Sequence, residues 1–377
     1  MTVFLTIAGV GIILFVLLEA FETIILPRQV TRRWRLTRLF YRATWRPYVA
    51  LVRPCPKKGR ERLLSFYGPL SFVLLLVFWG LLLLLGFALL HLVDGSVARL
   101  GNTGLERLGM ALYFSGSTLF TLGLGDIAPH TPLSRFLTVA EAFTGLGFLA
   151  IVVGYFRVLY QAFSRREAQI TLLDARAGSP PSATELLRRM IGGGDYRELH
   201  ELLEDWERWC AELLESHISY PVLCYFRSQH DNESWLASVA TILDTSALVL
   251  VGIDDTCQRQ AQLTFAIARH AVVDLSQVLG RKPDFARRDR LSPEDLERMR
   301  TVLSDAGVQL RRGEEADDRL AELRSMYEPY VHALAEMLMM PLPAWIREGR
   351  PDNWQTSSWG RITGDGRTRE TKVETHL

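Results

Sequence analysis

Cysteine is scarce in this chain, and the patterns that make cysteine chemically useful are missing. The 377 residues include only four cysteines, Cys55, Cys210, Cys224 and Cys257, with no Cys-x-x-Cys pair. Such spacing predicts neither a disulfide framework nor a zinc site, and it fits reduced thiols on the cytoplasmic side. Nor do we find a nucleophile–base pair or a cluster of metal ligands. We therefore expect neither an enzyme nor a resident cofactor or metal.

Acidic residues are nearly absent from residues 28–62, although the net charge of the whole chain is only +1. In this stretch Glu61 is the one acid, against twelve lysine and arginine side chains. Basic runs can bind nucleic acid, but this run lies between two apolar segments. By the positive-inside rule, residues 28–65 are therefore expected to form a cytoplasmic membrane loop, with no nucleic-acid partner.

Formal charge is also missing from long apolar runs, which predict three spans of a lipid bilayer. Residues 71–93 carry no formal charge, and at about 1.5 Å per residue such a helix covers the roughly 30 Å hydrocarbon layer. Residues 1–27 predict a first span, with no cleavage site typical of a signal peptide. A third begins near Pro132 and continues toward Phe163. Flanking arginines place the N-terminus outside and the C-terminal half inside a multi-pass protein of the cell membrane.

The connection between the last two spans contains a short helix and a glycine-containing loop. Thr103 and Glu106 have the spacing of a capping box, which predicts a helix from about residue 104. That helix would stop partway through the membrane and direct its negative C-terminal end at a cation. The sequence Thr-Leu-Gly-Leu-Gly-Asp follows at residues 121–126. Alternating glycines allow successive carbonyls to point the same way and to replace the water shell of a cation.

Residues 66–166 as a whole resemble the pore module of the potassium channels. The filter of that family usually reads Thr-Val-Gly-Tyr-Gly-Asp. An aromatic pair in the pore helix, Pro129 three residues after Asp126, and a mid-helix Gly145 strengthen the resemblance. It implies a re-entrant pore helix and filter between the last two spans. Together with the three apolar runs and the helical pattern of the C-terminal half, this predicts an all-α membrane protein with three transmembrane helices followed by an all-α cytoplasmic domain. The resemblance also implies a homotetramer, because one chain supplies one filter segment and a carbonyl ring needs several.

The resemblance carries specific roles onto this sequence. Backbone carbonyls would line the filter, the threonine hydroxyl at its inner end would add a ligand, and an aspartate would sit at the outer mouth. Apolar side chains of the inner helix would face a water-filled cavity. These positions are Thr121, Leu122, Gly123, Leu124 and Gly125 for the filter, Asp126 for the mouth, and Leu146, Leu149 and Val153 for the cavity.

Three departures from the family pattern bear on selectivity. The usual filter tyrosine is Leu124, which can pack but cannot brace the filter through a hydroxyl, and the usual preceding threonine is Phe120. The pore-helix position that is often acidic is Ser117, so no carboxylate pair with Asp126 can form there. Potassium-selective conduction is the favoured function; a non-selective cation channel and a non-conducting membrane sensor or scaffold are the alternatives.

Two residues of the third span have open interpretations. Glu141 is an ionisable group inside the membrane, which is a functional hypothesis by default; the favoured alternative is a carboxyl hydrogen-bonded behind the pore helix. Gly145 matches a position proposed as a hinge of the inner helix, but small residues are equally common where membrane helices touch.

The C-terminal half is expected to be a helical domain of unidentified ligand. Residues 167–184 predict a linker, 185–348 the domain and 349–377 a disordered tail. Residues 235–253 are apolar enough for a fourth span, but their polar side chains favour a buried helix of a soluble bundle. Neither the strand–Gly-x-Gly-x-x-Gly–helix unit of nucleotide-binding regulatory domains nor a strand-rich cyclic-nucleotide fold is indicated, and Gly192–Gly194 predict a hinge or cap.

Overall fold

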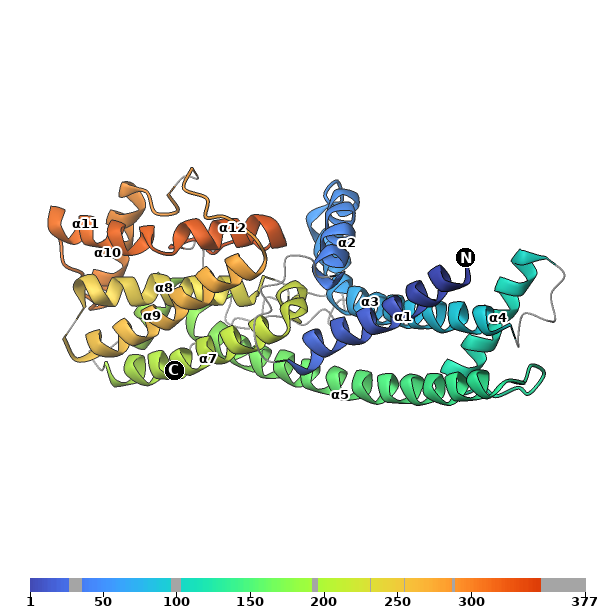
Figure 1. The fold of residues 1–377 in the computed structure, drawn as a ribbon. Helices are drawn as coiled ribbons and strands as arrows, with labels where there is room; N and C mark the ends of the chain where they lie inside the picture. The colour runs from blue at the N-terminus through green and yellow to red at the C-terminus, as the bar shows by residue number, and fades with distance from the viewer. Residues whose placement is uncertain are drawn as a thin grey trace, which may run out of the picture. The chain divides into compact units, whose positions relative to one another are not determined.

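A computed structural model describes residues 1–26, 36–95, 103–191, 196–230, 232–253, 255–286 and 289–346. Within these ranges the chain is helical and contains no strand, which confirms the predicted all-α fold. The chain divides into two compact units, Met1–Ala162 and Phe163–Leu377. Figure 1 shows the helices of both units.

The first unit contains the helices expected to meet the membrane. They are α1 (Thr2–Ala20) with a π-helical turn (Phe21–Ile25), α2 (Leu36–Val52), α3 (Lys57–Asp94), α4 (Gly104–Leu119) and α5 (Pro132–Ala177), the last of which continues into the second unit. By length and composition, four helices among the described residues can cross a bilayer, and three of them begin in this unit: Thr2–Ile24, Gly59–Asp94 and Pro132–Ala177. These coincide with the three spans that the apolar runs predict.

Two glycines bring the first span into close contact with α3. A Cβ atom on Gly9 would lie 2.8 Å from the carbonyl oxygen of Gly86, and one on Gly86 would lie 2.7 Å from Cγ1 of Ile13. Small residues at such crossings allow helix backbones to approach closely, which is how membrane helices gain packing energy. The N-terminal helix is thus an integral part of the first unit.

Two segments differ from the sequence-based expectation. The basic stretch 28–65, expected as a cytoplasmic membrane loop, contains regular secondary structure: it includes all of α2 and the first turns of α3. Its residues 28–35 lie outside the described residues. The predicted linker 167–184 is helical as far as Ala177, because α5 runs on without a break. Ser182 then caps the next helix by accepting a hydrogen bond from the Glu185 amide at 3.2 Å.

The second unit is a helical bundle in which α8 (Trp235–Gly252) is mostly buried by its neighbours. Its remaining helices are α6 (Ala183–Met190), α7 (Arg197–Ser219), the 3₁₀ turn η3 (Pro221–Tyr225), α8 (Trp235–Gly252), α9 (Asp255–Val278), α10 (Pro293–Asp305), α11 (Glu314–Ser325) and α12 (Glu328–Leu338). Helix α8 is long and apolar enough to cross a bilayer, but 83% of that window is buried within the protein. Protein contacts therefore account for its composition, as expected for residues 235–253.

A buried ion pair joins α8 to the later part of this bundle. Asp244 is 1% exposed, and the Arg290 guanidinium donates to its carboxylate at 2.6 and 3.0 Å. Desolvation raises the pKa of Asp244, and the charge of Arg290 opposes that rise. Removing one partner of such a pair would leave an uncompensated buried charge, which strongly destabilises a fold. The predicted Gly192–Gly194 hinge and the tail 349–377 lie outside the described residues, and the domain limits 185–348 stay predictions.

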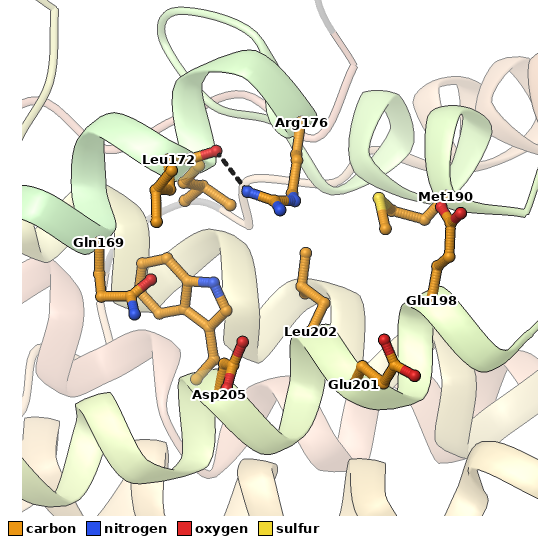
Figure 2. A pocket seen from close by; sticks show the side chains of 10 residues that line it. Gln169, Leu172, Arg176, Met190, Glu198, Glu201, Leu202 and Asp205 are labelled. Carbon is orange, nitrogen blue, oxygen red and sulfur yellow. Dashed lines mark hydrogen bonds between the residues drawn. The ribbon is translucent and has the colours of Figure 1, made fainter.

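A cavity of about 460 Å³ lies in the second unit, between the end of α5 and helices α6 and α7. Figure 2 shows Arg176 on one wall, donating to the Leu172 carbonyl at 3.1 Å, and the carboxylates of Glu198, Glu201 and Asp205 on α7. The cavity lining thus has three carboxylates and one guanidinium, and this excess of negative charge disfavours binding of a phosphate-containing ligand.

Three carboxylates also gather where α5 meets the loop before α8. Both carboxylate oxygens of Glu233 lack a hydrogen-bond partner among the described residues. Burial, followed by repulsion from Asp174 and Glu167, raises the pKa of Glu233 to about 8. The folded protein therefore holds a proton on Glu233 at neutral pH that the unfolded chain releases.

This difference predicts that Glu233→Gln flattens the pH dependence of stability. Because the pKa in the folded state lies above the ordinary value of 4.5, the free energy of unfolding falls as pH rises from about 4.5 through 8. We expect the variant to gain stability over the wild type at pH 9 and little at pH 5. Denaturant unfolding of the full-length protein in detergent measures this, with the exposed Glu212→Gln as matched control. An equal pH dependence in wild type and Glu233→Gln would contradict the prediction.

Candidate ion-conduction pore

The pore helix is α4, and its start confirms the predicted capping box. The Glu106 amide donates to the Thr103 hydroxyl at 3.2 Å, and the Thr103 amide donates to the Glu106 carboxylate at 3.1 Å. These two bonds satisfy amides that have no partner within the helix. The helix ends at Leu119, and Phe120 alone separates it from the segment predicted as the filter.

The filter segment has left-handed backbone at every second residue. The φ angles of Thr121, Gly123 and Gly125 are +56°, +58° and +78°. Alternation between left-handed and right-handed conformations turns successive peptide groups to the same side of the chain. The Leu122 amide donates to the Ser117 carbonyl at 2.7 Å, so the inner end of the segment is anchored on the last turn of α4.

Threonine is an unusual residue at such a backbone position. Left-handed backbone costs a non-glycine residue roughly 1–2 kcal/mol, and strain of this kind gathers at functional sites. Thr121 is the residue whose hydroxyl the family resemblance assigns to the inner end of the filter. A threonine at φ +56°, where glycine would cost less, is consistent with a role for that hydroxyl.

The outer end of the segment is held by a contact that the sequence did not predict. The Tyr113 hydroxyl donates to the Asp126 carboxylate at 2.8 Å, from the pore helix to the filter mouth. Ile127 packs on Phe114 and Met110 directly behind it. A tyrosine thus contacts Asp126 here, whereas Ser117, one turn further along α4, has no carboxyl group that could form a carboxylate pair with Asp126.

A buried polar cluster connects the three helices of the pore module. Glu141 on α5, His91 on α3 and Ser115 on α4 are all 0% exposed. One Glu141 carboxylate oxygen lies 3.0 Å from His91 Nε2, and the other accepts a hydrogen bond from the Ser115 hydroxyl. Glu141 therefore lies hydrogen-bonded behind the pore helix, as the second of its two interpretations expects. Sequence reasoning missed His91 and Ser115, which lie 50 and 26 residues away along the chain.

We expect Glu141→Ala to destabilise the protein strongly and Glu141→Gln to do so much less. Alanine leaves the buried His91 Nε2 without its partner, whereas the Ser115 hydroxyl, which also lies 2.9 Å from the Leu84 carbonyl oxygen, loses one of two partners. An unsatisfied buried group costs about 1–3 kcal/mol. Glutamine keeps one acceptor oxygen and adds a donor. Thermal unfolding of the detergent-solubilised protein, followed by size-exclusion chromatography, measures the difference. Equal melting temperatures for Glu141→Ala and wild type would rule out a stabilising role for the cluster.

The inner helix contains the remaining candidate residues. Leu146, Leu149 and Val153 are 61%, 59% and 63% exposed and lie along one stripe of α5. Gly145 is instead at a tight helix contact: a Cβ atom there would lie 2.1 Å from the carbonyl oxygen of Leu119. Of its two interpretations, close packing matches this geometry.

Comparison with known proteins identifies the class of this site. Residues 73–162 match the model of a family described as ion channel. These residues are therefore similar to the members of an ion-channel family. The match covers most of α3, all of α4, the filter segment and α5 as far as Ala162. An ion-channel family match together with several apolar helices indicates a lipid-bilayer environment. No solved structure matches this chain.

The curated relatives that match are membrane-associated or carry no functional name. An uncharacterised membrane protein of Bacillus subtilis (strain 168), YdjJ, is 28% identical over 214 residues, which are 56% of this chain and 61% of that protein. Protein LctB of Bacillus caldotenax is 34% identical and that of Geobacillus stearothermophilus 33%, each over 87 residues. Those 87 residues are 21% of this chain and 64% of each LctB protein. The chain thus spans less than two thirds of the length of these relatives.

Proposed function

We propose that this chain is a potassium-selective channel that conducts potassium passively through a homotetrameric pore. Its filter is formed by the carbonyls of residues 121–125 and by the Thr121 hydroxyl, with Asp126 at the outer mouth. Potassium is the transported ion, and no resident cofactor takes part. The cavity below the filter is lined by Leu146, Leu149 and Val153.

The observation that carries the proposal is the alternating left-handed backbone at Thr121, Gly123 and Gly125, directly after the C-terminal end of α4. Carbonyls turned to one side can coordinate a dehydrated cation. The helix end contributes roughly half a negative charge, which favours a cation at the same place. A leucine at position 124 leaves this carbonyl chemistry unchanged, since the ligands are backbone atoms.

Exposure of the filter supports a tetramer. Leu122 and Leu124 are 64% and 61% exposed, and Phe120 is 60% exposed. Non-helical backbone at membrane depth is tolerated only where protein covers it or water fills the pore. Copies of the same segment around one axis would cover these side chains and close the carbonyl ring.

We place the protein in the plasma membrane of the cell. In the proposed orientation the N-terminus lies outside and the second unit lies in the cytoplasm. The basic residues after the first span and after Ala162, including Arg165 and Arg166, then lie on the inner side. The second unit would act there as a gating sensor or as an assembly platform.

Full-length protein in liposomes tests conduction and selectivity together. We expect potassium flux that barium blocks, and a reversal potential in mixed potassium and sodium that follows the potassium gradient. Empty liposomes control for leakage. A reversal potential near zero with equal concentrations of the two ions on opposite sides would support the non-selective channel. No flux at any pH or voltage tested would support the non-conducting sensor or scaffold.

A further inference from the structure

Helix α2 is fixed to the ends of two membrane helices through one of its faces. The Thr44 hydroxyl lies 2.9 Å from the Tyr67 hydroxyl, and the Tyr48 hydroxyl donates to the Leu63 carbonyl at 2.6 Å. The Trp45 and Tyr67 rings pack with centroids 4.6 Å apart. At the other end of α2, the Thr37 amide and hydroxyl donate to Glu19 of α1 at 3.3 and 3.2 Å. This helix is therefore a fixed part of the first unit.

The opposite side of α2 carries an exposed arginine stripe, which we define as Arg38, Arg42 and Arg46. These residues are four apart and so lie above one another on one face of a helix. None of the three has an ion-pair partner among the described residues, and Arg53 adds a further exposed positive charge just after the helix. No acid occurs from residue 36 to residue 60. The stripe lacks a counter-charge within its own segment.

An exposed apolar face lies next to the arginine stripe. Leu39 is 62% exposed and Leu51 is 75% exposed, with Ala43, Pro47 and Ala50 between them, also exposed. Figure 1 shows α2 standing across the direction of α1 and α3, the two helices to which it is attached. A helix in this position, beside membrane-spanning helices, lies along the membrane surface when the spans cross the bilayer.

We propose that α2 lies in the interfacial layer of the membrane and binds anionic phospholipid headgroups through its arginine stripe. The Leu39–Leu51 face then contacts acyl chains, and the guanidinium groups reach the phosphates by extending along the helix surface. A nucleic acid could bind the arginine stripe through its phosphates, but it would leave Leu39 and Leu51 exposed to water. An acidic protein segment has the same disadvantage, so the paired faces favour a lipid surface over either. This inference does not depend on ion conduction.

Binding of defined lipids to the full-length protein tests the proposal. Phosphatidylglycerol and phosphatidylcholine are added in turn to the detergent-solubilised protein, and bound lipid is counted by native mass spectrometry. We expect the wild type to bind phosphatidylglycerol in preference to phosphatidylcholine. In the triple variant Arg38→Gln/Arg42→Gln/Arg46→Gln, the affinity for phosphatidylglycerol should fall by about fivefold for each of the three arginines removed. The matched control Arg208→Gln/Arg298→Gln/Arg319→Gln removes three exposed arginines of the second unit and should leave the preference unchanged. Equal binding of the two lipids, or an equal loss in both variants, would overturn the proposal.

A second measurement leaves the arginines in place. A nitroxide label on Leu51→Cys, in a Cys55→Ser background in liposomes, reports its depth through collisions with oxygen and with a water-soluble nickel complex. We expect greater access to oxygen, as for a group below the headgroups. Free access to nickel would place the face in water and overturn the proposal. So would strong coupling between labels of two copies, or retention of nucleic acid that is lost in the triple arginine variant.

Discussion

Gly123→Ala is expected to abolish ion conduction while leaving the protein folded. Gly123 has φ +58°, and nothing lies within 4 Å of a Cβ atom at this position in the chain. The effect therefore comes from the backbone alone, because left-handed conformation costs alanine roughly 1–2 kcal/mol relative to glycine. In a homotetramer the cost arises four times around one ring. The carbonyls then turn away from the pore axis, and the cation loses its ligands.

Gly109→Ala is the matched control for this substitution. Gly109 lies in α4, where nothing stands within 4 Å of an added Cβ atom and no positive φ is required. Alanine is favoured over glycine in a helix by about 1 kcal/mol, so this variant should be at least as stable as the wild type. Barium-sensitive potassium flux of both variants in liposomes measures the difference. Wild-type flux through Gly123→Ala would refute the assignment of the filter.

The filter segment and the start of the pore helix could be predicted from the sequence, because both depend on short-range sequence patterns. Thr103 and Glu106 are three residues apart, and the capping box that they form needs only that spacing. The glycines at 123 and 125 mark left-handed backbone because no other residue adopts it at so little cost. Both features depend on neighbours within a few positions, so the sequence alone contains them.

Contacts between distant segments could not be predicted in this way. His91 lies within an apolar run and carries no formal charge, so its contact with Glu141, 50 residues later, leaves no pattern in the sequence. Helix α2 was missed because its arginines follow the charge pattern of a cytoplasmic loop, while Pro47 within it argues against a helix. Its aromatic face becomes interpretable only once Tyr67 is known to pack against it.

Gly145→Ala is expected to abolish conduction for a different reason, the loss of a helix contact. An added Cβ atom would lie 2.1 Å from the Leu119 carbonyl oxygen, 3.0 Å from its carbonyl carbon and 3.2 Å from its Cα. All three are backbone atoms at the end of the pore helix, so no side-chain rotation can relieve the overlap. Either α5 moves outward or the end of α4 moves, and the filter starts directly after it.

Gly147→Ala supplies the control, because an added Cβ atom there meets nothing within 4 Å in the same helix. If Gly145 acts through packing, Gly145→Ala abolishes potassium flux and lowers the temperature at which the detergent-solubilised protein unfolds, whereas Gly147→Ala keeps both near wild type. If Gly145 acts as a hinge, the substitution changes the open probability in single-channel records while the unfolding temperature stays unchanged. Wild-type flux and stability in Gly145→Ala would contradict both the packing and the hinge interpretation. They would also mean that the inner helix does not approach Leu119 this closely.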